Sequence, residues 1–497
     1  MPAWMSRIPS GSDHVLTRGL FLRLLAVVYL VAFLSLWAQV HGLVGEHGIW
    51  PAARYLDAAR EQLGPERLWK IPTLLWLASG DAALDVLCGG GVVLAGLLLF
   101  GVAPLLCLVL LWTFYLSLVS AGGVFLSFQW DTLLLETGLL ACLLAPVRLL
   151  PRAEPKPHPP SFAAVLSLRW LLFKLMFLSG LVKLTSGDPA WRDLTALAVH
   201  YETQPLPAWT SWWMHQAPLW FSRASCLGMF VVELAVPLFI FAPRRLRMVA
   251  FAGLLGFQGL IAATGNYGFF NLNTAVLCVM LLDDRALSRI LPGRLRARCP
   301  EGTARETRRR PWVVLASASG LFLLSAVAFS GEIAGYRRLP KSFLRIAEEI
   351  APFRSINGYG LFRVMTTERL EIEIEGSRDG IAWEPYGFRW KPGDPGRRPG
   401  FVAPHMPRLD WQMWFAALGT RERNPWLLRC LRKLLEGEPE VLSLFGTNPF
   451  PGEPPRFVRA RIRRYRFTGP AARRETGAWW ELGPPALYAP VLTRSGS

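Results

Sequence analysis

The sequence predicts a multi-pass α-helical membrane bundle of eight or nine spans, followed by a mixed, β-rich extracytoplasmic domain with helical insertions. Three observations support this fold class. Hydrophobic residues make up 52% of the 497-residue chain and charged residues only 18%, whereas a soluble domain carries about a quarter charged residues. The mean hydropathy is positive, at +0.29. Apolar runs of membrane-spanning length recur before residue 335, and none follows it.

Residues 1–335 are predicted to form the polytopic transmembrane domain. A bilayer core needs about 20 residues of helix, and most of the apolar runs reach that length. The expected spans are residues 20–40, 81–100, 103–121, 125–147, 162–185, 218–242, 246–263, 269–282 and 312–330. The run at 269–282 is short, which is typical of a broken or buried helix. We interpret the first span as an uncleaved anchor, because no small-x-small cleavage site follows it.

The distribution of positive charge predicts the orientation of the bundle. The formal net charge is +18. If the N-terminus is cytoplasmic, the loops after the fourth, sixth and eighth spans share its side, and these loops are rich in arginine. The opposite loop at 265–268 has no Lys or Arg, as the positive-inside rule requires. The loop at 42–80 carries both signs of charge, which indicates a re-entrant or surface segment. Nine spans place the C-terminal domain outside the cytoplasm.

Residues 336–497 are predicted to form the β-rich domain. Residues 369–375 alternate with period two, and Asp379-Gly380 suits a hairpin turn into a second strand at 381–390. Residues 456–467 alternate Arg with apolar residues, which predicts a strand with one cationic face, and 410–435 has helical spacing of aromatics. The cationic face could bind nucleic acid or anionic lipid; the alternative is a solvated face. A location outside the cytoplasm disfavours nucleic acid.

Polar side chains inside the predicted spans are the sharpest signal, since each costs about 2.5–3.5 kcal/mol at a helix centre. In one interpretation, Asp131 and Glu136 form internal ion pairs with Arg169 and Lys174. In the other, the polar groups line a cavity at membrane depth. The remaining intramembrane polar residues are Lys183, Glu233, Asn266, Asn271 and Asn273.

The segment 179–207 offers candidates for catalysis. Lys183 ends a predicted span, and His200 and Glu202 end the short helix that follows. Lys183 is either a catalytic base among apolar neighbours or a lysine that snorkels to the interface. The histidines have no ligand spacing, so no metal site is expected.

Several chemistries have no support in the sequence. Motifs for phosphoryl transfer, zinc hydrolysis and serine hydrolysis are absent. The seven cysteines lack metal-ligand spacing, and we expect neither a disulfide framework nor a structural zinc site. No cofactor is expected.

Several segments in order along the chain resemble the lipase maturation factor family. They include FLSFQWDTLLLETGLLA, TGNYGFFNLNTAVLCVMLLDD, PHMPRLDWQMWFAALG and NPWLLRCLRKLLEGEPEVLSLFGTNPFP. The resemblance covers roughly Leu20 to Phe467. It implies a multi-pass membrane protein that, in animals, resides in the endoplasmic reticulum and assists folding and dimer assembly of secreted lipases. It also implies a lumenal C-terminal region.

The resemblance implies a non-enzymatic folding factor whose partners are membrane lipid and a lipase-like secreted client. The expected location is the endoplasmic reticulum membrane for a eukaryotic chain and the inner or plasma membrane for a bacterial one. The expected client contacts lie in the outer domain, and the alternative is that they form its core. They are Tyr359, Arg408, Asp410, Trp411 and Trp414.

The membrane part is also distantly similar to the vitamin K-dependent gamma-carboxylase superfamily. Gly180, Lys183 and Leu184 match a Gly-x-x-Lys-Leu stretch that supplies the lysine base there. This similarity implies an alternative function, a membrane enzyme with Lys183 as base. A cavity that gathers Lys183, His200, Glu202 and Asn266 would favour it. A lipid or small-molecule transporter is a third hypothesis, but inverted repeats are not evident.

Overall fold

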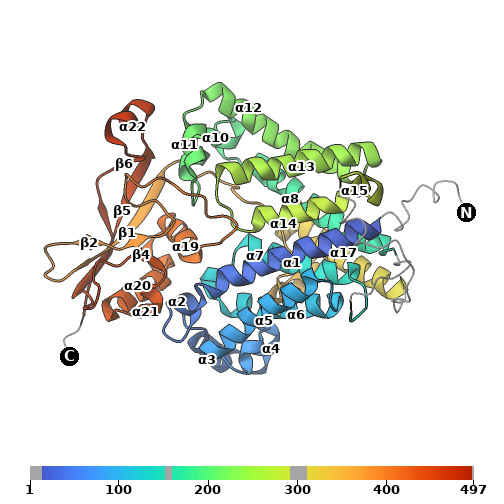
Figure 1. Ribbon diagram of the computed structural model, residues 1–497, viewed down its shortest axis with the longest axis horizontal. Helices are drawn as coiled ribbons and strands as arrows, with labels where there is room; N and C mark the ends of the chain where they lie inside the picture. The colour runs from blue at the N-terminus through green and yellow to red at the C-terminus, as the bar shows by residue number, and fades with distance from the viewer. Residues whose placement is uncertain (1–13, 151–158, 291–310, 495–497) are drawn as a thin grey trace, which may run out of the picture.

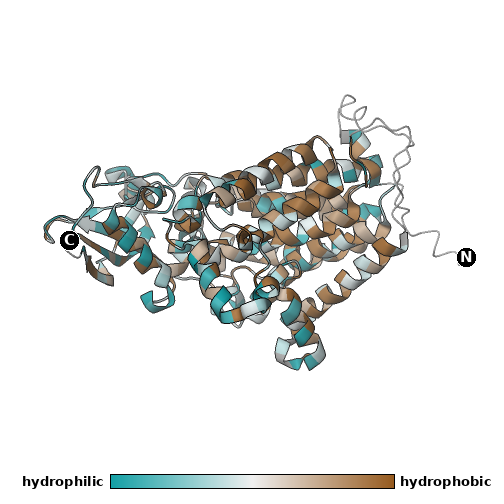
Figure 2. Ribbon diagram, turned by 90° about the horizontal axis from the view of Figure 1, so that it is seen from below, coloured by the Kyte–Doolittle hydropathy of each residue, from teal (hydrophilic) through white to brown (hydrophobic). Residues whose placement is uncertain are grey.

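In the computed structural model, which describes residues 14–150, 159–290 and 311–494, a helical bundle and a sheet-containing domain lie at opposite ends of the molecule (Figure 1). The chain begins at the far end of the bundle and finishes in the sheet-containing domain. Figure 2 shows that hydrophobic residues dominate the bundle and that hydrophilic residues are more frequent in the other domain.

Among the described residues, seven helical stretches are long and apolar enough to cross a membrane. This agrees with the predicted helical membrane bundle; the number of crossings stays a prediction. The stretches are α1 (Val15–Trp37), α5 (Asp81–Leu99), α6 (Pro104–Ala121), α8 (Phe162–Thr185), Leu219–Phe241, α13 (Arg244–Thr264) and α17 (Pro311–Ala334). Leu219–Phe241 joins α12 (Leu219–Phe230) to a π-helical turn, η6 (Val231–Ala235), and a 3-10 turn, η7 (Val236–Phe241).

Two further predicted spans are shorter helices in the middle of the bundle. They are α7 (Gln129–Leu144) and α14 (Phe270–Cys278), which continues as η8 (Val279–Leu281). A Cβ added at Gly138 of α7 would lie 1.9 Å from the Tyr29 hydroxyl of α1, so only glycine permits this close helix contact. The short helix expected at 269–282 corresponds to α14 and η8, and most of its residues are buried.

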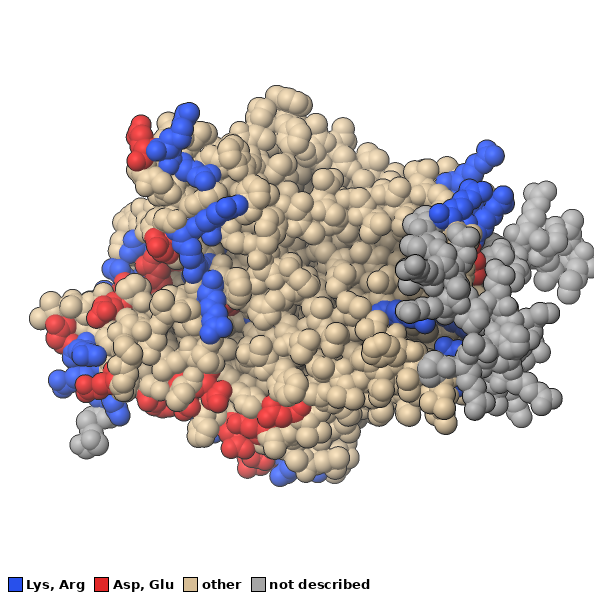
Figure 3. All heavy atoms as spheres, viewed as in Figure 1, with Lys and Arg blue, Asp and Glu red and all other residues tan. Residues whose placement is uncertain are grey.

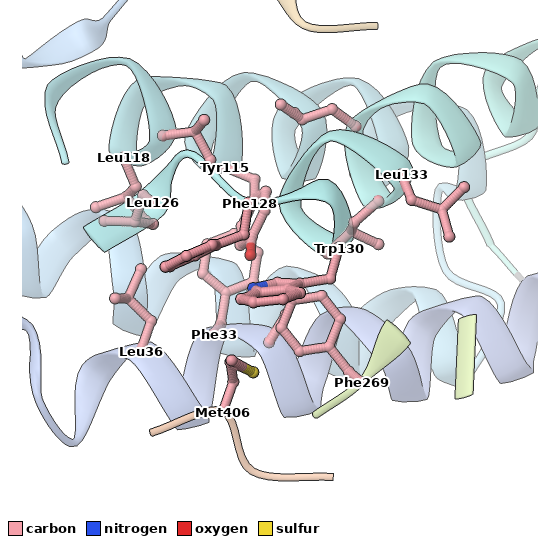
Figure 4. Close-up of a cluster of buried hydrophobic side chains, with 14 of the residues drawn as sticks. Phe33, Leu36, Tyr115, Leu118, Leu126, Phe128, Trp130, Leu133, Phe269 and Met406 are labelled. Carbon is pink, nitrogen blue, oxygen red and sulfur yellow. The ribbon is translucent and has the colours of Figure 1, made fainter. Parts of the chain in front are cut away.

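An aromatic cluster fills the bundle next to the outer domain (Figure 4). Phe33 and Tyr115 make an edge contact at 5.4 Å between ring centroids, and Phe128 stacks on Trp130 at 4.4 Å. Met406, from the C-terminal part of the chain, reaches into this cluster and is fully buried. The two parts of the molecule thus share one hydrophobic core.

Figure 3 shows Lys and Arg side chains at both ends of the molecule. Arg244 and Arg245 begin α13 and Arg285 and Arg289 lie on α15 (Asp284–Ile290), at the end of the bundle where α1 begins, whereas the arginines of the predicted loops at 151–158 and 291–310 lie outside the described residues. Backbone amides at the start of α1 bind the Asp284 carboxylate, and Arg244 pairs with Asp283 at 2.6 Å. The segment that follows α7 lies at the same end, because the Leu149 carbonyl accepts a hydrogen bond from the N–H of Ala103, in the turn between α5 and α6. The C-terminal domain lies at the opposite end.

Short helices cover the end of the bundle that faces the C-terminal domain. The expected surface segment at 42–80 contains α2 (Val40–Val44), α3 (Ala52–Leu63), η3 (Gly64–Glu66), α4 (Arg67–Lys70) and η4 (Leu74–Trp76). Later connections contain α9 (Pro189–Arg192), α10 (Ala196–Thr203) and α11 (Trp209–His215). Helix α15 (Asp284–Ile290) lies at the N-terminal end, and η9 (Tyr336–Arg338), α18 (Lys341–Ile350) and η10 (Ala351–Phe353) follow α17.

The C-terminal domain contains a five-stranded sheet in the order β2-β1-β5-β6, with β7 also pairing β5. Its strands are β1 (Arg369–Ser377), β2 (Glu384–Pro385), β5 (Phe457–Phe467), β6 (Trp480–Leu482) and β7 (Ala486–Thr493). A second sheet pairs β3 (Gly387–Phe388) with β4 (Phe445–Thr447). The strands expected at 369–375 and 456–467 are confirmed, but 381–390 forms only the short β2 and β3.

Helices fill the insertions of this domain: α19 (Arg408–Ala417), η11 (Arg421–Arg423), α20 (Pro425–Glu436), α21 (Pro439–Leu442) and α22 (Pro470–Thr476). The single helix expected at 410–435 is two helices. The break occurs where Pro425 begins α20, since proline is favoured in a first turn and not in a helix interior.

The cationic face predicted for 456–467 is neutralised by the neighbouring strand. Residues of β1 and β5 are paired antiparallel in register, and glutamates of β1 face arginines of β5. Arg459 and Arg461 both bind Glu375, and Arg463 binds Glu373 at 3.0 Å. The face is therefore a ladder of ion pairs, which gives no support to binding of an anionic polymer.

Candidate functional site

A buried ion pair joins the outer domain to the bundle. Arg408, at the start of α19, places both terminal nitrogens on the Asp131 carboxylate of α7, at 2.8 and 2.9 Å. Its guanidinium also donates to the Phe125 carbonyl, and Tyr115 donates its hydroxyl to Asp131. Burial alone would lower the pKa of Arg408, but Asp131 raises it above its usual range. Both side chains are about 1% exposed or less, so the pair is a fixed structural joint.

A second buried network lies one and a half turns further along α7. Glu136 pairs with Lys174 of α8 at 2.5 Å. Its other oxygen accepts the Tyr359 hydroxyl at 2.7 Å and the Asn357 side chain at 3.2 Å. The segment after η10 thus closes over this ion pair.

The predicted internal pairing is therefore half right. Glu136 and Lys174 do pair, whereas Asp131 pairs with Arg408. Arg169 lies near the opposite end of α8, where it donates to the Met280 carbonyl and to His14. Arg169 could not reach Asp131, because the two residues occupy opposite ends of antiparallel helices.

Asn266 is a clamp between the two parts and does not line a cavity with Lys183. Its amide nitrogen donates to the carbonyls of Leu206 and Gly400, and its oxygen accepts the backbone N–H groups of Val402 and Ala403. These contacts tie the 400–403 loop to the connection at Leu206, which corrects the expected place of Asn266 in a catalytic cavity.

Lys183 and Glu233 form an ion pair beside a cavity within the membrane bundle. The Lys183 ammonium binds both carboxylate oxygens of Glu233, at 2.6 and 2.7 Å. Glu233 lies on the π-helical turn η6, and a Cβ at Gly180 would meet its Cβ at 2.8 Å, so Gly180 lets α8 approach this turn. The ammonium also lies 5.4 Å from the Trp191 ring centroid. These contacts explain Gly180 and Lys183 as packing and pairing residues.

The cavity has a volume of about 630 Å³ and lies between α8, α12, α13 and α14. Its polar lining includes Lys183, Glu233, His200, Tyr267 and Asn271, and most of its surface is apolar. A cavity lined by some of the predicted intramembrane polar residues is therefore present, and its two charged residues pair with each other. Its depth in a membrane stays a prediction.

His200 lines this cavity and belongs to a chain of hydrogen bonds with Tyr267 and Gln204. Its Nε2 lies 2.9 Å from the Tyr267 hydroxyl, which in turn donates to Gln204 Oε1 at 2.8 Å. Burial, followed by the charge of Lys183, lowers the pKa of His200 to about 4. The imidazole is therefore neutral at physiological pH.

Glu202 does not join Lys183 and His200. Its carboxylate accepts the Phe467 backbone N–H at 2.7 Å and lies 3.5 Å from His215 Nε2. The cavity therefore gathers Lys183 and His200 but neither Glu202 nor Asn266, and the predicted four-residue constellation does not form. Within the residues described, no group of His, Cys, Asp or Glu side chains could hold a metal ion.

The five residues expected to contact a client are buried, which supports the alternative that they form core. Arg408, Asp410 and Trp411 are between 0 and 3% exposed, and Tyr359 and Trp414 are buried as well. Asp410 accepts the backbone N–H groups of Trp390 and Lys391, and Trp414 donates to the Thr203 carbonyl. Burial raises the pKa of Asp410. These side chains fix the domain and cannot touch a client in this structure.

The sequence patterns did not predict that Tyr267 lines the cavity or that Gln204 accepts its hydrogen bond. They also did not predict the glycines that border the cavity. Their signal was available in part. Tyr267 stands in a polar turn between two spans, and Gly228 and Gly256 interrupt apolar runs without a turn or a tight contact that requires glycine.

Comparison with known proteins identifies the same family over both parts of the chain. The lipase maturation factor transmembrane domain matches residues 16–289, and the lipase maturation factor C-terminal domain matches residues 355–489. Lipase maturation factor 1 of Bos taurus is 38% identical over 509 residues, covering 96% of this chain and 89% of its own. Lipase maturation factor 2 of Homo sapiens is 37% identical over 576 residues, covering 94% and 81%. No solved structure matches. The chain therefore belongs to the lipase maturation factor family.

Proposed function

We propose that this protein is a membrane-anchored folding factor that assists the maturation of secreted lipases or related secreted clients. The observation that carries the proposal is family membership across both the bundle and the outer domain. The relatives are named for lipase maturation, and the similarity spans nearly the whole of this chain. The protein acts without a cofactor, and the outer domain faces the client.

The outer domain faces the side opposite the cytoplasm. Support comes from the sequence, in which the short connections on the side of the N-terminus carry most of the arginines between spans, as the positive-inside rule expects for the cytoplasmic side. That side is the endoplasmic reticulum lumen in a eukaryotic host and the periplasm or exterior in a bacterial one. Protease added to sealed vesicles of known orientation should digest the outer domain only when the extracytoplasmic face is outside; the reverse pattern contradicts the orientation.

The client contacts the far edge of the five-stranded sheet. In the described structure β7 pairs only with β5, so its other edge is open to an extended segment of a client. Leu487 and Val491 on this strand are 63% and 43% exposed, unlike the buried residues first expected to bind.

Co-expression with a secreted lipase tests both the role and the surface. We expect more active secreted lipase with the intact chain than without it. A photoactivatable residue at Leu487 should crosslink to the newly made lipase, whereas one at Val93, exposed on α5, should not. Equal lipase activity with and without the protein, in a host lacking its relatives, would contradict the proposed role.

A second candidate function is a membrane enzyme that uses Lys183 as a base. One observation favours it, since Lys183 and His200 line the same cavity. The bidentate pair with Glu233 stabilises the protonated amine, so the base would form only after the proton leaves this pair. If Lys183→Met supports full lipase maturation and no lipid product disappears from the membranes, the enzyme hypothesis fails.

A further inference from the structure

We infer that the cavity between α12 and α13 binds a long-chain membrane lipid whose head carries a hydroxyl group, with that hydroxyl donating to His200 Nδ1. The inference goes beyond the proposed maturation role, because it concerns a ligand of the bundle and not the client.

The cavity opens sideways between two peripheral helices. Gly228 on α12 and Gly256 and Leu260 on α13 border it and are exposed on the side of the bundle. A Cβ added at Gly228 or Gly256 would meet nothing within 4 Å, so the glycines leave the mouth open and do not serve a close helix contact. In a membrane, the exposed side of an apolar helix faces lipid. A lipid can therefore enter the cavity directly from the bilayer.

The shape and lining of the cavity fit a chain with one polar end. Its volume of about 630 Å³ lies in the range of small-ligand sites. Along α8 it extends from Lys183 to Leu175, which is about 12 Å at roughly 1.5 Å per residue. Lys183 and His200 line one end of the cavity, and Leu175 and Met176 contribute apolar wall at the other. Gln258 and Asn271 also line the cavity, but their amide groups donate to Met176 Sδ and to the Gln258 carbonyl. The head group therefore belongs near His200 and the chain near Leu175.

The hydrogen-bond chain at His200 determines which head group fits. Gln204 donates its amide nitrogen to the Thr264 and Tyr201 carbonyls, so its oxygen must face Tyr267. Tyr267 donates its single hydroxyl hydrogen to that oxygen, so the Tyr267 hydroxyl must accept a hydrogen bond from His200 Nε2–H. His200 Nδ1 is left as an acceptor, and no hydrogen-bond partner for it is found within the described residues.

A hydroxyl donor satisfies this acceptor, whereas an anionic head does not. Lys183 and Glu233 neutralise each other within the wall, with both side chains under 10% exposed, so the cavity offers no uncompensated positive charge. A carboxylate near His200 would face the Nδ1 lone pair and Glu233. A monoacylglycerol has both the hydroxyl and the single chain that the cavity requires.

Photocrosslinking of the purified full-length chain in nanodiscs tests the inference. The probes are a diazirine-bearing monooleoylglycerol, the matching methyl oleate, which has no donor, and the matching oleate. We expect the monoacylglycerol to label peptides of α8, α12 and α13 about five- to tenfold more than methyl oleate, as one hydrogen bond predicts. His200→Phe should remove this preference while methyl oleate labelling persists.

Glycine variants separate the cavity from the rest of the lipid-facing surface. Gly256→Leu fills the mouth and should reduce labelling of the cavity at least tenfold, and Gly228→Leu should do the same from the opposite helix if the first variant folds poorly. Gly320→Leu is the matched control, since Gly320 is also exposed on a membrane helix with nothing within 4 Å of an added Cβ. Labelling unchanged by both mouth variants, equal labelling by the three probes, or a preference for oleate would overturn the inference.

Discussion

The most direct test of the domain joint is the removal of the Arg408 guanidinium. In Arg408→Met the aliphatic part of the side chain is kept, but Asp131 loses two charge-assisted bonds and retains only the Tyr115 hydroxyl. The Phe125 carbonyl also loses its donor. Removing one member of a buried ion pair costs about 3–5 kcal/mol, because the remaining charge is left uncompensated. We expect the free energy of opening the joint to fall by this amount.

The double variant Asp131→Leu, Arg408→Met distinguishes this cause from a loss of packing. With no charge left to bury, it should regain most of the lost stability, apart from about 1 kcal/mol each for the Tyr115 hydroxyl, which loses its acceptor, and the Phe125 carbonyl, which loses its donor. Native-state proteolysis of the full-length chain in detergent measures the opening. The single variant should be cleaved about two to four orders of magnitude faster than the parent. Equal cleavage of the single and double variants would refute the reasoning.

Three other changes probe the contacts between the parts. Asn266→Ala removes four hydrogen bonds to the 400–403 loop and its surroundings; at about 1 kcal/mol each or less, hydrogen exchange of that loop should accelerate at least tenfold. Gly138→Leu forces α1 and α7 apart and should lower stability by about 1–3 kcal/mol in thermal unfolding, whereas Gly96→Leu, with open space around it, should not. Folding lowers the pKa of His200 from 6.5 to about 4, so between these pH values the unfolded chain binds a proton that the folded chain does not. The free energy of unfolding is therefore unaffected by protonation of His200 above pH 6.5 and falls as the pH is lowered toward 4. That loss reaches about 3 kcal/mol, and His200→Phe should flatten the pH dependence of denaturant unfolding.

Hydrophobic patterning predicted the long helices of the bundle and the two long strands, β1 and β5, but not the break between α19 and α20. Apolar runs located the long helices to within a few residues, since a helix in lipid must be apolar over most of its length. Period-two alternation located β1 and β5, because apolar residues of each strand lie on one face of the sheet and the paired glutamates and arginines on the other. The ion pairing across these strands was not predicted, because register is set by contacts between segments more than 80 residues apart.

Partner identity was the part that the sequence could not supply. Asp131 and Arg408 are separated by 277 residues along the chain, and helical spacing says which residues share a face but not what packs on it. The same limit applies to the proposed client contacts. Arg and Trp at high density suggested a binding surface, but both residue types also form buried networks when each polar atom finds a partner. In Arg408 and Trp414 they do so.

The pairing of the buried charges bears on what the bundle does. If the bundle were only an anchor, its intramembrane carboxylates would be compensated within it. Glu136 pairs with Lys174 within the bundle. The arginine that pairs with Asp131 and the tyrosine that donates to Glu136 both come from beyond residue 355, in the C-terminal part. A bundle without that part would leave Asp131 as a buried, uncompensated charge, at a cost of several kcal/mol. The C-terminal domain is thus a structural requirement of the bundle, and these two networks fix how the domain carrying β7 sits against it.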